Sequence, residues 1–222
     1  MENPVTIYWA GDLFNFKDLA GNMQLASAVE KLSGGRYEIK LPQLSESNSK
    51  RTVKEIRDAD LELLINCDMI LANFDGTDLD SGTVVEFCFA RMLDMPCLLL
   101  RTDFRSNGDQ AGGDPWNLMC SGYPRTETLI LHGMTLFHTH FGKGGTGQEI
   151  LNSYYNDMAQ KIIDCLDRVR REPPIYPPEI LEEHYRRIIA AGGESLTALF
   201  PPKRIEQIVK SKLAKREDAA RI

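Results

Sequence analysis

The amino-acid sequence predicts an α/β fold, in which helices cover both faces of a doubly wound parallel sheet. Short apolar runs rich in β-branched and aromatic residues alternate with amphipathic segments from residue 5 to residue 101. The connections between these segments are short, and the order strand–helix repeats along the chain. In such sheets ligands bind beyond the carboxyl ends of the strands, so we expect a site there.

Each element follows from a local pattern. The run VTIYWA begins the predicted sheet, Pro42 stops its second strand, and Pro96 precedes the fourth. Between them, apolar residues recur at helical spacing. The predicted strands are 5–10, 37–41, 69–74 and 97–101, and the predicted helices are 22–33, 52–66 and 83–94.

The pattern loosens after Arg101. We expect a polar, Gly-rich loop at 101–114, a short helix or turn at WNLMCSG, a further strand at 128–137 and a long helix at 148–171. The segment EPPIYPPE holds four prolines and predicts a linker. The chain therefore divides into a catalytic domain, 1–171, and an extension, 172–222, whose charged helices we expect to pack on their own domain rather than to hold a partner protein.

Composition narrows the class of protein. A chain of 222 residues with 42% hydrophobic residues suits a soluble globular protein, and a net charge of −6 argues against a nucleic-acid partner. The five cysteines are scattered without a CxxC pair, which indicates free thiols in a reducing compartment. The start resembles no signal peptide and no apolar run is long enough to cross a bilayer, so we expect a cytoplasmic protein without a membrane partner.

Three features that could mark a phosphate, dinucleotide or metal site lack the required spacing. FGKGGTGQE, residues 141–149, lacks the spacing of a phosphate-binding P-loop, so a flexible loop is favoured over a phosphate cradle. The first strand leads into AGDLF rather than GxGxxG, which argues against a dinucleotide fold. His132, His138 and His140 lack the clear spacing of a metal site, and we interpret them as structural.

The stretch DGTDLDSGTVVEFCFARM, residues 75–92, carries the most informative carboxylates. Glu86 lies inside an apolar run, and Thr83-x-x-Glu86 fits a capping box, which on that signal alone is favoured over catalysis. Capping explains neither Asp80, on the turn before the helix, nor Asp60, beside the apolar stripe of the preceding helix. Both interpretations of Glu86 stay open at this point.

Carboxylates that converge on one strand end suit the cleavage of a glycosidic bond. One attacks or shields the anomeric carbon while another group protonates the leaving group. We expect the helix N-terminus to help keep Glu86 ionised. Tyr8, at the end of the first strand, either orients Glu86 or simply packs in the core.

Five motifs together resemble the nucleoside 2-deoxyribosyltransferases over about residues 5–120: TIYWAGDLF, LPQ, RDADLELLINCDMILANFDG, DLDSGTVVEFCFA and PWNLM. The resemblance implies a flavodoxin-like sheet and no metal or organic cofactor. It implies a homo-oligomer built from dimers, commonly a hexamer, with a site shared between subunits. The implied activity, in nucleoside salvage, is transfer of 2-deoxyribose between nucleobases by a ping-pong route through a covalent deoxyribosyl-glutamate.

The resemblance also assigns roles. Glu86 matches the nucleophile, Tyr8 the residue that positions it, and Asp60 the acid that protonates the leaving base. Asp80 matches a residue that holds the sugar hydroxyls, and Asn117 one that reaches the 5′-hydroxyl in a neighbouring subunit's site. The other expected substrate-binding residues are Gln43 facing the base, Phe14 walling the pocket, Gly11 and Ser81, of which Ser81 serves a 5′-phosphate or caps the helix.

Two alternatives remain open. The same nucleophile would serve an N-glycoside hydrolase of deoxynucleosides or their 5′-monophosphates, and no sequence motif distinguishes water from a base as the second attacking group. A protein of another class, a non-catalytic nucleotide-binding module, is disfavoured because Tyr8, Asp60, Asp80 and Glu86 are all present. The chain also continues past EPPIYPP, where members of the family often end.

Overall fold

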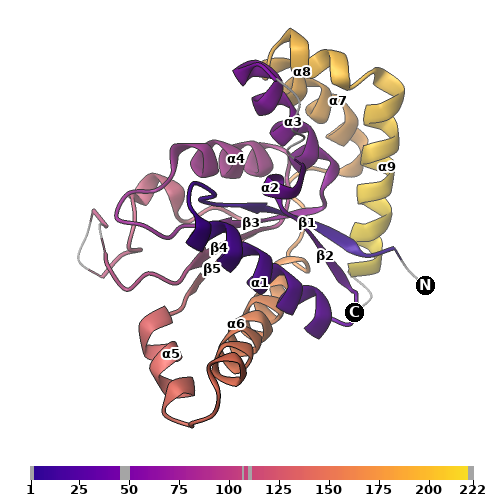
Figure 1. The fold of residues 1–222 in the computed structure, drawn as a ribbon. Coiled ribbons are helices and arrows are strands. Elements are labelled where there is room, and N and C mark those ends of the chain that lie inside the picture. The colour runs from indigo at the N-terminus through magenta and orange to yellow at the C-terminus, as the bar shows by residue number, and fades with distance from the viewer. Residues whose placement is uncertain (1–2, 46–50, 107, 110–111, 220–222) are drawn as a thin grey trace.

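A computed structural model describes residues 3–45, 51–106, 108–109 and 112–219. Five parallel strands form one sheet in the order β2-β1-β3-β4-β5, as Figure 1 shows. This is the flavodoxin-like order, in which the connections change direction between β1 and β3. The predicted α/β class is confirmed. The strands are β1 Val5–Ala10, β2 Tyr37–Lys40, β3 Met69–Asn73, β4 Cys97–Arg101 and β5 Thr126–Ile130.

Helices cover both faces of the sheet, so the three central strands, β1, β3 and β4, alternate between two hydrophobic cores. Ile7 and Trp9 of β1 face α1, Phe16–Leu32, and α6, Gly147–Val169. Tyr8 and Ala10 face the opposite side, which holds α3, Val53–Asn66, and α4, Ser81–Met92. Burial of both faces explains why these three strands read as nearly continuous apolar runs.

The first four strands match their predicted ranges to within a residue, and the differences lie at helix starts. Helix α1 begins six residues before the predicted range because the Asn15 side chain accepts hydrogen bonds from the backbone N–H groups of Lys17 and Asp18. Helix α3 begins after Thr52, which forms a capping box with Glu55. Two short elements complete this region, α2 Pro42–Ser45 and the 3₁₀ helix η1 Leu118–Cys120.

The strand predicted at 128–137 is wrong in its second half. Strand β5 ends at Ile130, and the chain turns into α5, Gly133–Phe141. Gly133 allows the turn because its N–H donates to the Thr102 carbonyl at 2.9 Å, and a Cβ there would lie 2.9 Å from that same oxygen. An apolar run shared by a short strand and a helix cannot be divided by hydrophobicity alone.

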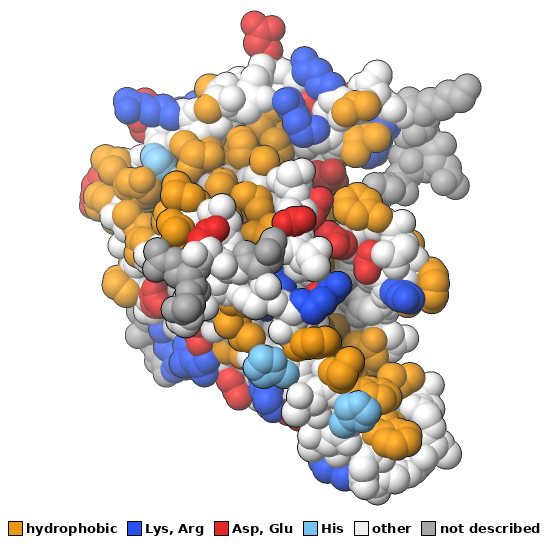
Figure 2. Space-filling view, turned by 90° about the vertical axis from the view of Figure 1, so that its left-hand side faces the viewer, with side chains coloured by type: hydrophobic (Ala, Val, Ile, Leu, Met, Phe, Trp, Pro, Cys, Tyr) orange, Lys and Arg blue, Asp and Glu red, His pale blue; other side chains and the backbone are white. Residues whose placement is uncertain are grey.

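Helices α5 and α6 form a hairpin whose outer part protrudes from the body of the molecule (Figures 1 and 2). His140 is buried inside the hairpin, where its ring nitrogens lie 2.7 Å from Ser153 Oγ and 3.1 Å from Asp157 Oδ2. These contacts agree with a structural role for this histidine. The glycine-rich segment before α6 ends in a capping box between Thr146 and Glu149.

The extension packs on the face that also holds α3 and α4. It comprises α7 Pro178–Ala191, α8 Glu194–Leu199 and α9 Pro202–Ala219, which lie together on one side in Figure 1. Leu181, Tyr185 and Leu196 are fully buried in the same core as Tyr8 and Phe87. Within the described residues, none of the helices has the length and apolar character that crossing a bilayer requires.

Candidate active site

Tyr8 and Glu86 form the central contact of the site. The Tyr8 side chain is fully buried, and its Oη donates a hydrogen bond of 2.5 Å to Glu86 Oε1. Burial, with the nearby Glu86 carboxylate, raises the pKa of Tyr8, so the phenol keeps its proton and acts as the donor. Tyr8 therefore orients Glu86, rather than only packing in the core.

The capping box expected at Thr83 and Glu86 is wrong. Asp80 is the N-cap of α4, and its Oδ2 accepts from Thr83 N at 2.7 Å and from Thr83 Oγ1 at 2.9 Å. Glu86 is the sixth residue of the helix, a full turn beyond the position from which a glutamate caps. Because Asp80 takes the capping role, the Glu86 carboxylate is turned toward Tyr8.

The surroundings of the Glu86 carboxyl group raise its pKa. Burial raises its pKa from 4.5 to about 7, the Tyr8 hydrogen bond opposes that rise, and the Asp60 and Asp80 carboxylates add to it. That the helix N-terminus helps to keep Glu86 ionised stays a prediction, while the surroundings as a whole favour the neutral form. Near pH 7 the group is present in both protonation states.

Three elements bring four of the predicted residues together. Tyr8 comes from β1, and the half-buried Asp60 comes from α3. Glu86 lies in the second turn of α4, and Asp80 is the N-cap of that helix. The charge of Asp60 acts on both Tyr8 and Glu86, and the charge of Asp80 acts on Glu86. The result is a carboxylate cluster around one short hydrogen bond, which suits stabilisation of positive charge on a bound group.

Asn117 lies on the exposed surface, immediately before η1. It caps η1 by accepting from Met119 N at 2.9 Å. Together with Leu79 and Val84, which flank Asp80 and Thr83, it lines a cavity of about 520 Å³. Figure 2, which views this side of the molecule, shows acidic side chains near the middle of the face among apolar ones.

Among the described hydrogen bonds, none joins the remaining predicted residues to Glu86. Gln43 donates to the Leu19 carbonyl at 3.0 Å and so faces α1. Phe14 is 73% exposed, and Ser81 is exposed at the first position of α4. At Gly11, a Cβ would lie 3.0 Å from Asn73 Cβ, so this glycine permits close packing of the two strand ends.

Arg101 and Asp75 shape the site. Asp75 begins the acidic stretch that the sequence singled out, whereas Arg101 was not predicted. Arg101 is buried at the end of β4 and donates to the carbonyls of Phe74, Gly76 and Arg105. Asp75 accepts from Thr102 N at 2.5 Å and Thr102 Oγ1 at 2.6 Å. Together they fix the loop that leads to Asp80. A terminal arginine on the apolar run CLLLR was the available signal.

Asp12 extends the acidic cluster toward α1, the helix that covers the opposite face of the sheet. It lines a second cavity with Asn73, Asp75 and Tyr154, and burial followed by the charge of Asp80 raises its pKa. Among the residues that the structure describes, no group of three or more histidine, cysteine or acidic side chains has the arrangement of a metal site.

Comparisons with known proteins identify one family and several similar chains. The family model for nucleoside 2-deoxyribosyltransferase matches residues 7–119. A conserved protein from Enterococcus faecalis V583, known from its crystal structure, is 25% identical with a TM-score of 0.50, and the match covers 57% of this chain and 91% of that chain. The comparison with curated proteins gave no match.

Two further solved structures are more distant. A 2-desoxiribosyltransferase from Leishmania mexicana is 23% identical with a TM-score of 0.45, over 64% of this chain and 100% of that chain. A 2-deoxyribosyltransferase from the psychrotolerant bacterium Bacillus psychrosaccharolyticus is 20% identical with a TM-score of 0.40, over 52% and 79% of the two chains. The family match ends before β5, so α6 and the extension lie outside it.

Proposed function

The chain belongs to the nucleoside 2-deoxyribosyltransferase family, and from this premise we propose that it transfers 2-deoxyribose between nucleobases with Glu86 as the nucleophile. Family membership supports chemistry at the N-glycosidic bond of a nucleoside. The observation that carries the finer proposal is the 2.5 Å hydrogen bond from buried Tyr8 to Glu86, between the carboxylates of Asp60 and Asp80.

In the first half-reaction, a Glu86 carboxylate oxygen bonds to C1′ of a 2′-deoxynucleoside as the bond from C1′ to the base nitrogen breaks. The electron pair of that bond leaves with the base, and Asp60 supplies the proton that neutralises it. Positive charge develops on the sugar in the transition state, where the Asp80 carboxylate stabilises it, together with Asp60 as that group gives up its proton.

In the second half-reaction, a nitrogen of a second base attacks C1′, and Glu86 leaves as a carboxylate. The proton lost by the incoming base returns to Asp60, so the enzyme ends in its starting state. Asp80 and Asn117 hold the sugar, and Asn117, exposed in the single chain, serves the site of a neighbouring copy.

Hydrolysis is the alternative outcome for the same covalent intermediate. We would incubate the protein with thymidine or deoxyinosine, each with and without excess adenine, and separate the products by chromatography. Deoxyadenosine that forms only when adenine is present supports transfer. Free base and deoxyribose without a new nucleoside would replace the proposal by hydrolysis. A second round uses the 5′-monophosphates, and no reaction in either round would favour a binding module.

Tyr8→Phe is expected to lower kcat by roughly 10- to 100-fold, because a hydrogen bond to a charged group is worth about 1.5–3 kcal/mol. Losing this bond also removes the interaction that favours ionised Glu86, so the pKa of Glu86 rises further. The acidic limb of the pH–rate profile, expected near pH 7, should therefore move to higher pH in the variant.

Tyr37→Phe is the matched control, because Tyr37 is also a buried strand tyrosine whose hydroxyl donates to a carboxylate, that of Asp167 at 2.5 Å. It lies on β2, away from Glu86, and should leave the profile unchanged. An unshifted profile in Tyr8→Phe would show that Tyr8 does not act on the reacting carboxylate.

Asp60→Asn is expected to slow substrates with poor leaving groups more than those with good ones. A base that leaves readily needs little protonation in the transition state, whereas a poor leaving group depends on the proton donor. The measurement is kcat/KM for a series of deoxynucleosides whose bases differ in basicity. Equal losses of kcat/KM across the series would show that Asp60 is not the proton donor.

A further inference from the structure

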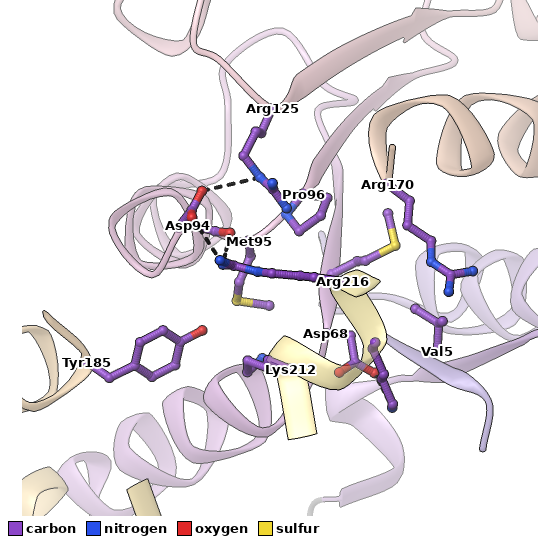
Figure 3. A pocket seen from close by; sticks show the side chains of 12 residues that line it. Val5, Asp68, Asp94, Met95, Pro96, Arg125, Arg170, Tyr185, Lys212 and Arg216 are labelled. Carbon is purple, nitrogen blue, oxygen red and sulfur yellow. Dashed lines mark hydrogen bonds and ion pairs between the residues drawn. The ribbon is translucent and has the colours of Figure 1, made fainter. Parts of the chain in front are cut away.

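A third cavity lies at the opposite end of the sheet, where the strands begin. Val5, Met69, Pro96 and Arg125 bring the amino ends of β1, β3, β4 and β5 to this cavity, and α9 of the extension closes it. In Figure 3 the side chains of Arg125 and Arg216 meet at Asp94, and Tyr185 and Arg170 lie on opposite sides of Arg216. The free volume of about 40 Å³ holds roughly three water-sized groups, which is too small for a nucleoside.

Basic groups outnumber acidic ones in this cavity, although the protein carries a net charge of −6. Both carboxylates are already engaged. Asp94 pairs with Arg125 at 3.2 Å and Arg216 at 3.0 Å, and Asp68 pairs with Lys215 at 2.6 Å. The basic residues are Arg125, Arg170, Lys212, Lys215 and Arg216, against Asp68 and Asp94. The excess of three positive charges favours an anion.

Three buried polar atoms at the cavity have no hydrogen-bond partner. One, Arg125 Nε, lies 3.2 Å from Asp94 in an ion pair, and the other two are Tyr185 Oη, on a side chain with no exposed surface, and Arg216 Nη1. In Figure 3 the Tyr185 hydroxyl points from α7 toward the side of the cavity where Lys212 and Arg216 lie. Buried hydroxyl and guanidinium groups are normally satisfied, so these two donors indicate an acceptor that the protein itself does not supply.

Lys212 carries a charge that burial disfavours. It is buried on α9 and donates to the Cys67 carbonyl. Burial lowers the pKa of Lys212 to about 8, partly offset by the Asp68 carboxylate. An anion beside the ammonium group would relieve the cost of burying that charge.

We propose that this cavity binds a tetrahedral oxyanion, either free inorganic phosphate or the phosphate end of a phosphomonoester. The anion accepts hydrogen bonds from Tyr185 Oη and Arg216 Nη1 and neutralises part of the charge of Lys212 and Arg170. Tyr185, Lys212 and Arg216 belong to the extension, whereas Arg125 and Arg170 belong to the preceding chain, so the bound anion fastens α9 to the sheet.

The test is a calorimetric titration of the full-length protein with inorganic phosphate in chloride buffer of constant ionic strength. We expect one saturable site per chain that Tyr185→Phe weakens at least about tenfold, since it removes one hydrogen bond to a charged group. Without phosphate, Tyr185→Phe should melt at the wild-type temperature or above, because its hydroxyl has no partner to lose. Equal affinity in wild type and Tyr185→Phe would overturn the proposal.

Lysine variants on α9 give a second, independent readout. Lys212→Met should lose the rise in melting temperature that phosphate causes in the wild type, whereas Lys210→Met, at an exposed position of the same helix, should keep it. If the basic side chains only compensate the C-terminal ends of α4 and α6, neither titration nor melting will show saturable binding, and the proposal fails.

A competition experiment with a deoxynucleoside distinguishes phosphate binding in this cavity from phosphate binding in the active site. A saturating concentration of deoxynucleoside should leave phosphate binding unchanged, because the two sites lie at opposite ends of the strands. Displacement of phosphate by the nucleoside would place the anion at Glu86 and reject the cavity. A parallel titration with a sugar 5-phosphate identifies the source: tighter binding than phosphate assigns a phosphomonoester, and weaker binding assigns the free ion.

Discussion

Glu86→Gln is expected to lower base exchange by at least about 10⁴-fold while the protein stays folded, as loss of a covalent nucleophile does in other enzymes. The amide keeps the size of the carboxyl group and still accepts the Tyr8 hydrogen bond, but it cannot form the covalent sugar ester. Exchange is measured by chromatography of thymidine and adenine mixtures. Turnover near the wild-type rate would remove Glu86 as the nucleophile.

The same variant is expected to be more stable than the wild type at pH 8. Folding raises the pKa of Glu86 from 4.5 to about 7. The free energy of unfolding therefore falls as pH rises through that interval, because the folded state must then bury a charge. The difference corresponds to about 3 kcal/mol above both values. Glutamine avoids that cost, so the melting temperature should rise by roughly 5–10 °C at pH 8.

At pH 5 most of this difference should disappear, because the wild-type Glu86 is then protonated in the folded state. Glu206→Gln, at an exposed position of α9, is the control and should change neither activity nor the pH dependence of stability. A Glu86→Gln protein that melts at the wild-type temperature at both pH values would contradict the raised pKa.

Removal of the extension, by ending the chain after Glu172, is expected to leave no cooperatively folded protein. The deletion takes seven buried apolar side chains from the core that contains Tyr8 and Phe87: Leu181, Tyr185, Ile189, Leu196, Phe200, Ile205 and Val209. At about 1.5–3 kcal/mol each, their burial contributes roughly 10–20 kcal/mol, as an upper estimate. That amount matches or exceeds the net stability of about 5–15 kcal/mol of a typical domain.

Circular dichroism, thermal melting and dye binding on the shortened protein test this expectation. Leu196→Ala in the full chain gives a graded version and should lower the free energy of unfolding by about 2–5 kcal/mol, since the side chain is fully buried. Lys203→Ala, at an exposed position of α9, should have little effect. A soluble shortened protein with a sharp melting transition would show that residues 1–172 fold alone.

The sequence by itself determined the alternation of strands and helices and the stretch that supplies the central carboxylates. Buried parallel strands must be apolar throughout, so runs such as MILAN and CLLLR stand out without any knowledge of the fold. The motif DSGTVVE identified Glu86 by resemblance, although the Thr83 spacing also fitted a capping box. Local pattern could not choose between these roles, because Asp80 and Thr83 are both good caps.

Only the tertiary structure decided the state of Glu86 and the place of the extension. The pKa of a carboxyl group depends on its burial and on every charge around it, here from β1, α3 and α4, and these come together only when the sheet forms. Likewise, the helices of the extension are amphipathic in sequence, but which core they complete depends on the apolar face that α3, α4 and the sheet leave uncovered. Such long-range contacts leave no local periodicity, so the sequence predicts the elements while the fold determines their chemistry.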